Sequence, residues 1–243
     1  MSRSLLSATA FATCLGLGVV ASAAQDPLVV SPDAYRLEFE NAWVKVVRVV
    51  YGPKAVLAPH FHTPRASAYV YLNDGGPILF QHEGLPYAGV TRPATKAGSF
   101  RVYKGLVEVH SVENPTATPS EFLRVEFKTE PLDDASLKGK FFREPAGQAG
   151  TGQRVQFSNA QVRITRVYVA RGEAVSLTAA GDQPALLLAL VPTGLAEAGG
   201  SRRQLEIGGN AWLDAGASAI VRPLGDAGEV LRFDFKTRPT ASR

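Results

Sequence analysis

Three histidines in the first half of the chain have the residue type and spacing of a metal site. His60 and His62 are two positions apart, and in an extended strand such positions point to the same face. His110 follows after enough strand-forming sequence to wrap a barrel and return beside this pair. Neutral imidazoles suit zinc, iron, copper and nickel, and three of them leave one face of an ion open for water or substrate. We therefore expect a metal site at His60, His62 and His110, against the alternatives of a polar pair at a strand edge and a hydrogen-bonded core histidine.

Other polar residues near these histidines have less specific roles. His82 is either a solvated residue in a turn after a strand, which the sequence favours, or a fourth ligand. Glu108 is expected to face solvent, and Asn114 to tie down the loop after His110 through backbone hydrogen bonds. Arg65 either pairs with a substrate carboxylate or faces water. Four further side chains could line a pocket, although strand alternation predicts that half of them point outward: Tyr69, Tyr71, Arg101 and Tyr103. No general base or other catalytic residue is assigned.

The elements that must position these side chains are short strands. Segments rich in Val, Ile, Tyr and Phe alternate with Gly, Pro, Asn and Asp, and no segment keeps a helical period over three turns. Many short strands at such spacing favour a sandwich or closed barrel, so an all-β fold is expected. The clearest predicted strands are 43–51, 68–72, 78–81, 99–103, 107–109, 121–127, 161–169 and 230–235.

The chain also repeats itself. Residues 39–49 recur as 157–167, and residues 121–131 recur as 229–239. Each unit therefore opens and closes on a matching strand, and all four histidines lie in the first unit. The total of 243 residues suits two domains of ordinary size. We expect an N-terminal barrel with the metal site, a linker, and a C-terminal barrel without ligands: residues 25–131, 132–152 and 153–243.

The second unit serves as an internal control for the first. Aligned by the repeats, residues 176–181 fall where 59–62 lie, and Val221 falls on His110. Neither histidine nor a cluster of acids replaces the ligands there. We expect the second barrel to bind no metal and to have packing, lid or partner roles. Phe141 and Phe142 in the linker could dock it onto a barrel.

The composition and the N-terminal residues predict where the protein is located. Residues 1–24 carry one cation, an apolar run and small residues at a cleavage point, which predicts a signal peptide and a periplasmic or secreted protein. The run is too short for a stable membrane span, although a short anchor is the alternative. Cys14 is the only cysteine, so the mature chain would have none. The formal net charge of +4 comes without a long basic run, so no nucleic-acid partner is expected.

With these motifs the sequence resembles the cupin superfamily, as a tandem bicupin. The match rests on Pro59-His60-Phe61-His62 and on His110 followed by Asn114. Cupins place a Glu five residues beyond the second His, where this chain has Ser67. The turn before His110, residues 105–109, also departs from the cupin pattern. The resemblance implies two tandem jelly-roll (cupin) barrels, with a variant site of three histidines in the first and a degenerate second barrel.

The missing carboxylate bears on function. A dication on neutral ligands keeps its full charge, which strengthens its Lewis acidity and its hold on anions. Three-histidine cupins include dioxygenases of chelating anionic substrates, so the leading hypothesis is a metal-dependent oxygenase of a small anionic or chelating molecule. The alternatives are a zinc-type lyase or isomerase and a non-enzymatic module that binds a small ligand or metal.

The sequence is compatible with several metals and with two oligomeric states. The cofactor is expected to be a divalent ion, namely Fe, Zn, Cu, Ni or Mn. The signal lacks a twin-arginine pair, so export would occur unfolded and the ion would be acquired outside the cytoplasm, which favours Cu and Zn. A monomer and a homodimer are equally compatible with a tandem cupin.

Overall fold

The computed structural model describes residues 26–84, 89–130, 140–142 and 150–240. The expected signal peptide, Cys14 and most of the expected linker lie outside these residues. Within them the only helix is the single turn α1 (Pro27–Val30), and everything else regular is strand, as the sequence predicts. No helix in the described part of the chain is long and apolar enough to cross a membrane.

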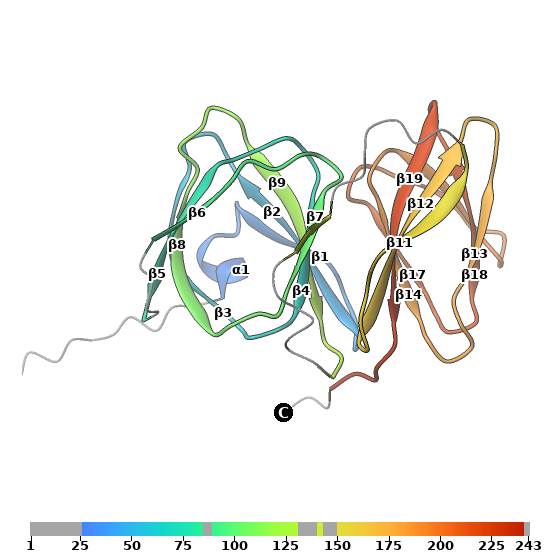
Figure 1. Ribbon diagram of the computed structural model, residues 1–243, viewed down its shortest axis with the longest axis horizontal. Helices are drawn as coiled ribbons and strands as arrows, with labels where there is room; N and C mark the ends of the chain where they lie inside the picture. Colours follow the sequence, from blue (N-terminus) through green and yellow to red (C-terminus); the bar gives the residue numbers. More distant parts are fainter. Residues whose placement is uncertain (1–25, 85–88, 131–139, 143–149, 241–243) are drawn as a thin grey trace, which may run out of the picture.

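The first half of the chain forms two facing sheets (Figure 1). The larger sheet has the order β1-β2-β9-β4-β7-β10, and the smaller has the order β3-β8-β5-β6. The strands are β1 (Tyr35–Glu40), β2 (Val44–Tyr51), β3 (Val56–His62), β4 (Ser67–Tyr71), β5 (Ile78–Glu83), β6 (Gly89–Arg92), β7 (Phe100–Tyr103), β8 (Glu108–Glu113), β9 (Ser120–Phe127) and β10 (Lys140–Phe142).

The second half repeats this plan. One sheet has the order β11-β12-β19-β14-β17 and the other β13-β18-β15-β16. The strands are β11 (Gly152–Ser158), β12 (Val162–Ala170), β13 (Val175–Thr178), β14 (Ala185–Ala189), β15 (Thr193–Glu197), β16 (Arg202–Leu205), β17 (Asn210–Leu213), β18 (Ser218–Pro223) and β19 (Ala227–Phe235). The repeated sequences are thus β1–β2 with β11–β12, and β9 with β19.

Strand alternation gives the larger sheet of each barrel two buried faces. In β9, Leu123 and Val125 point to one side, while Phe122 and Arg124 point to the other. The first side packs against the corresponding sheet of the second barrel. The second side closes the interior of the first barrel. This double burial leaves only Glu121 of β9 partly exposed, although the strand also carries Arg124 and Glu126.

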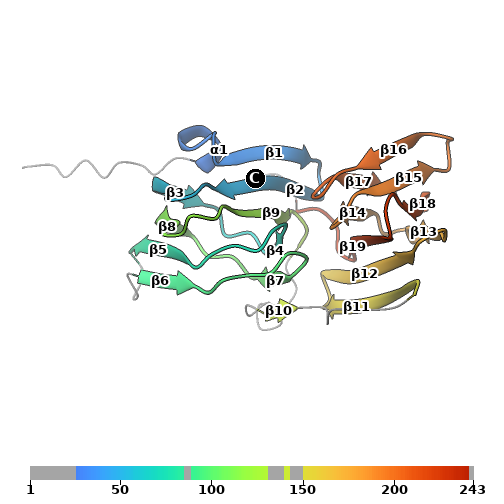
Figure 2. The same cartoon turned by 90° about the horizontal axis from the view of Figure 1, so that it is seen from above.

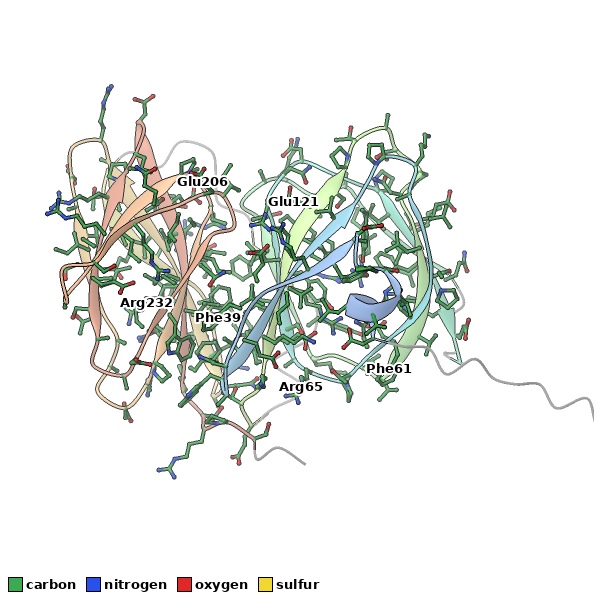
Figure 3. All side chains as sticks on the ribbon, turned by 180° about the vertical axis from the view of Figure 1, so that it is seen from behind. Phe39, Phe61, Arg65, Glu121, Glu206 and Arg232 are labelled. Atoms are coloured by element: carbon green, nitrogen blue, oxygen red, sulfur yellow. The ribbon has the colours of Figure 1, made fainter. Side chains whose placement is uncertain are left out.

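The two barrels lie side by side and share one hydrophobic cluster between their larger sheets (Figures 1 and 2). Phe127 lies against Phe233 and Phe235 across this boundary, with ring centroids 6.4 and 6.1 Å apart. Phe39 stacks on Trp212 of the second barrel at 5.9 Å and is seen between the barrels in Figure 3. Each barrel also has its own interior cluster. The molecule is therefore built around three apolar layers.

Three local features concern the linker, the start of the second barrel and the end of the first barrel. β10, inside the expected linker, pairs antiparallel with β7, so backbone pairing attaches this segment to the first barrel. The second barrel begins with β11 at Gly152, one residue earlier than the sequence suggests. The expected domain boundaries otherwise stay predictions. At an open end of the first barrel, α1 lies beside β1 and β3 (Figure 2).

Candidate metal centre

The three expected ligands meet inside the first barrel. His60 and His62 lie on β3 and His110 lies on β8, where His60 pairs directly with His110. Each of the three pairs of imidazole rings has a centroid separation of 4.9 Å. All three side chains are buried, and their nitrogens come within 4.8 Å of one another. A β-bulge in β3 between Leu57 and His60 turns the two histidines inward after an exposed segment.

Hydrogen bonds define the tautomer of His60. Its Nδ1 lies 2.9 Å from the carbonyl oxygen of Ala58, which can only accept, so Nδ1 carries the hydrogen. The lone pair is then on Nε2, which accepts from the Tyr35 hydroxyl at 3.0 Å. Tyr35 is in turn 2.9 Å from the hydroxyl of Tyr51. A ring anchored to a carbonyl through one nitrogen and open at the other is the usual state of a metal-ligating histidine.

His62 and His110 have different surroundings. Arg124 on β9 donates to Nδ1 of His62 from Nη1, so this nitrogen is the one with the lone pair. An ion at His62 must therefore displace Arg124 from Nδ1 or take the place of the Nε2 hydrogen. Nε2 of His110 is buried and has no hydrogen-bond partner among the described residues. Such an orphaned nitrogen fits a role as a metal ligand.

Burial keeps the three imidazoles neutral. It lowers the pKa of His60, lowers that of His62 well below its ordinary value with help from Arg124, and lowers the pKa of His110 to about 4. Neutral rings are the form that binds metal, so no proton has to be removed at pH 7. The close approach of the three rings, the unpaired Nε2 of His110 and the neutral state of the imidazoles all fit a divalent ion. The donors that would hold it are His60, His62 and His110.

The structure corrects two expectations for the neighbouring residues. Glu108 does not face solvent: it is 5% exposed, two positions before His110 on the same face of β8. His82 is not a solvated turn residue but lies within β5, with its side chain 5% exposed. Nε2 of His82 is 3.1 Å from Glu108, and Nδ1 of His110 is 3.5 Å from the same oxygen. Glu83-Gly84 favours a turn at this point of the sequence, but pairing of His82 with His110 continues the strand to Glu83.

Glu108 thus supplies a carboxylate to an interior where the sequence motif lacks one. Burial alone would raise its pKa, but the contact with His110 and the charges of Arg92 and His82 outweigh burial and lower it to about 2. His82, Glu108 and His110 form a second group whose ligand atoms lie within 4.8 Å of one another. Ser67, which occupies the expected carboxylate position, is buried and donates to the Arg65 carbonyl.

A cavity of about 210 Å³ opens beside His62. Tyr35 and Arg124 line its inner part, Arg65 and residues 26–28 line its outer part, and Figure 3 shows Arg65 at the end of the first barrel. The volume accommodates a small organic molecule. The lining carries both charge signs, with Lys45 paired to Asp26, Lys128 to Glu40 and Arg124 to Glu126. The described residues show no ion pair for Arg65.

The expectation for Asn114 is confirmed. Its amide donates to carbonyls of Tyr51, Gly52 and Thr118, and its oxygen accepts from Thr116. It therefore fixes the loop that joins β8 to β9.

The expectation that half of the four pocket candidates point outward is wrong. All four occupy odd-numbered positions on β4 and β7, and the interior cluster contains or contacts each of them: Tyr69, Tyr71, Arg101 and Tyr103. Sequence reasoning missed Tyr35, Tyr51, Arg92 and Arg124, which lie on strands that carry no histidine and belong to no metal-binding motif.

The second barrel replaces this interior with apolar packing. Val221 pairs with Val175 as Val112 pairs with Leu57, so His110 corresponds to Ala219 and not, as aligned by sequence, to Val221. The interior residues of β13, β15 and β18, together with the residue that follows β13, form one apolar cluster: Val175, Leu177, Ala179, Leu195, Ala219 and Val221.

Comparison with known proteins agrees with this architecture. The sequence matches no family model and no curated protein. Among solved structures, the chain is similar to the protein YhaK from Escherichia coli, with a TM-score of 0.57 and 14% identity over 83% of this chain and 91% of that one. It is similar to a salicylate 1,2-dioxygenase from Pseudaminobacter salicylatoxidans, with a TM-score of 0.56 and 11% identity over 80% and 71%.

A third similar structure is a cupin 2 conserved barrel domain protein from Leptotrichia buccalis, with a TM-score of 0.53 and 12% identity over 84% of this chain and 88% of that one. At these identities the likeness establishes the fold. The protein has the cupin fold as a tandem of two jelly-roll barrels, the first of which contains the three-histidine group.

Proposed function

We propose that the protein is a metal-dependent oxygenase, dioxygenase-like in its chemistry, that acts on a small anionic or chelating substrate. The observation that carries the proposal is the convergence of three neutral imidazoles, from His60, His62 and His110, beside a cavity of about 210 Å³. A divalent ion bound there would supply redox and Lewis-acid activation of the substrate.

Residues of the chain position and screen the substrate. The inner cavity is formed by Tyr35 and Arg124, which offer a hydroxyl and a cation next to His62. Burial, and then the neighbouring Tyr51, raises the pKa of Tyr35 well above its ordinary value, so its hydroxyl keeps its proton at neutral pH. The hydrogen that it donates to His60 Nε2 is released when that lone pair binds an ion, and Tyr35 can then donate it to a substrate oxygen. Arg124 favours a substrate that brings negative charge to this part of the site.

The solved structures support this choice of chemistry. They include salicylate 1,2-dioxygenase and its adducts with gentisate, which is an aromatic carboxylate. Such a molecule is small, anionic and able to chelate through neighbouring oxygens. The proposal also places the protein in the periplasm or outside the cell, on the strength of the N-terminal sequence.

Metal content and oxygen uptake test the proposal. Protein matured in its own exported compartment is analysed for metals and then supplied with salicylate or gentisate in an oxygen electrode. Stoichiometric iron, manganese, copper or nickel with substrate-dependent uptake of oxygen is the expected result. Zinc without oxygen uptake would exclude the oxygenase, and a protein with no metal would exclude any metal-dependent function.

Two variants and one control sharpen this test. His60→Ala and His110→Ala should each lose the ion and the oxygen uptake. Ser176→Ala changes an exposed residue on β13, the strand that corresponds to β3 in the second barrel, and should retain both. Full metal content in both histidine variants would place the ion elsewhere.

A further inference from the structure

Three arginines of the first barrel gather around the ring of Tyr69. The guanidinium carbons of Arg101, Arg92 and Arg124 lie 4.4, 5.5 and 5.9 Å from its centroid. Arg101 and Arg124 flank Tyr69 in register on β7 and β9, and Arg92 reaches in from β6, stacked 3.9 Å over Phe80. The three cations thus come from three strands and both sheets, and point into one region.

The positive charge of this cluster is only partly offset by the acids around it, because three guanidinium groups share two carboxylates, those of Glu108 and Glu126. Nε and Nη2 of Arg101 are screened from solvent and have no hydrogen-bond partner among the described residues. Burial and the charge of Arg92 lower the pKa of Arg101. Of the two nearby acids, Glu126 lies 3.2 Å from Arg124 and so pairs with one of the three cations, while Glu108 contacts the histidines. Guanidinium groups in such surroundings are costly unless an anion joins them.

The second barrel shows what the fold itself requires. Arg232 corresponds to Arg124 and is satisfied within the barrel: Nε and Nη2 lie 2.7 and 2.6 Å from Asp234, and Nη2 donates to the Thr178 carbonyl. By register, Leu187 and Ala211 stand where the first barrel has Tyr69 and Arg101. Both barrels therefore have a paired arginine at this position of the closing strand. Arg101 and Tyr69, in contrast, occur only in the first barrel.

The space around these side chains indicates how a ligand would reach them. Arg124 borders the cavity of about 210 Å³ beside His62, and it also borders a void of about 10 Å³ shared with Arg92, Tyr69 and His110. Arg101 lines neither space and lies next to the void through Tyr69, its neighbour in register. The void holds about one water-sized group. A whole ligand does not fit there, but the end of a ligand seated in the larger cavity does.

We propose that Arg92, Arg101 and Arg124 form an oxyanion subsite that binds the carboxylate of a small organic acid whose body occupies the cavity beside His62. The proposal deepens the proposed function, because it names the substrate class and the residues that select it. A planar carboxylate matches the fork of a guanidinium and supplies the acceptors that Arg101 lacks. Tyr69 holds the cations in place through their stacking on its ring.

Benzoate binding to metal-free protein tests this subsite. Protein treated with a chelator is titrated with sodium benzoate by calorimetry at low chloride concentration, with Arg101→Gln and Arg203→Gln as variants. Benzoate should bind wild-type protein, and Arg101→Gln should weaken binding at least tenfold. Arg203 is on the exposed face of β16 in the second barrel, so its variant should bind as wild type does. Equal binding by wild type and Arg101→Gln, or no binding by wild type, would overturn the proposal.

Thermal stability gives a second readout that a merely structural arginine would not produce. Without benzoate, Arg101→Gln should melt at a higher temperature than wild type, because one of several unbalanced cations is gone. With benzoate, the wild-type melting temperature should rise and that of the variant should stay. A variant that melts lower than wild type both with and without benzoate would show that Arg101 is structural. If Arg101→Gln does not fold, Arg92→Gln is measured in the same way.

These results are separable from the test of the oxygenase. Benzoate binding that depends on Arg101, in a protein without oxygen uptake, supports the subsite while rejecting the enzyme. Oxygen uptake with salicylate that is unchanged by Arg101→Gln rejects the subsite while supporting the enzyme.

Discussion

At the scale of single residues, the site is a set of ionisable groups whose charges are set by burial. His60, His62 and His110 are neutral, whereas Glu108 is ionised beside them. Arg124 offers a positive charge to the same space. A metal ion entering this group meets three neutral donors, one nearby anion and one competing cation. The balance between Glu108 and Arg124 should therefore tune how tightly the ion is held.

Glu108→Gln should weaken metal binding by about 10- to 100-fold, the usual effect of removing a group that supports a ligand. The carboxylate contacts His110 and His82, and its negative charge favours a cation nearby. Competition with a chromophoric chelator measures the change. Glu113→Gln, at the exposed end of the same strand, is the matched control and should bind as wild type does. Unchanged affinity in Glu108→Gln would mean that this carboxylate serves the fold alone.

The histidines also predict how stability depends on pH. Burial lowers the pKa of His110 to about 4, against an ordinary value of 6.5, so between these pH values the unfolded chain binds more protons than the folded one. The free energy of unfolding of metal-free protein should therefore be level above pH 6.5 and fall on acidification toward pH 4. His110 alone contributes up to about 3 kcal/mol. Urea titrations from pH 7.5 to 4.5 test this, and His110→Asn should flatten the slope; an identical slope in the variant would contradict it.

At the scale of elements, strand pairing decides which residues meet. His60, His110 and His82 form one line of neighbours across β3, β8 and β5. The loop after β8 must be fixed for this register to hold, and Asn114 fixes it through bonds to the end of β2 and to its own loop. Position on a strand therefore matters as much as residue type in this site.

Asn114→Asp should lower the free energy of unfolding by about 2 to 4 kcal/mol, because the amide donors are lost and a carboxylate would face three carbonyl oxygens. Urea denaturation measures the loss. Asn73→Asp, which removes one donated bond to Pro119, should cost about 1 kcal/mol and calibrates the effect. Equal losses in the two variants would show that the loop after β8 is no more constrained than an ordinary turn.

The sequence predicted what depends on type and local spacing. The pair of histidines on one strand face, their meeting with His110, the all-β class and the role of Asn114 all follow from such patterns. Glu108 and His82 were misplaced because their burial depends on cross-strand neighbours. Arg124 was missed because both faces of β9 are buried, so the sequence pattern does not show which face points into the first barrel. The second face is buried only because the second barrel docks against it.

At the scale of the molecule, duplication separates the chemistry from the scaffold. The first barrel adds buried histidines and arginines to its interior cluster, where the second has mainly apolar side chains, although both have the same strand order apart from β10. We expect one metal ion per chain and none in the second barrel, as metal analysis of wild type and His62→Ala would show. A His62→Ala protein that still holds one ion would place metal outside the three-histidine group.

The shared cluster between the larger sheets should make the two barrels unfold as one unit. Phe235 is fully buried in this cluster and contacts Trp43, Phe127 and Trp212. Phe235→Ala should therefore cost about 3 to 5 kcal/mol and lower a single calorimetric transition without splitting it. By the same coupling, metal binding in the first barrel should raise the melting temperature of the whole molecule. Two wild-type transitions, of which only one moves when metal is added, would show that the apolar second barrel is an independent domain and not a support on which the first barrel depends.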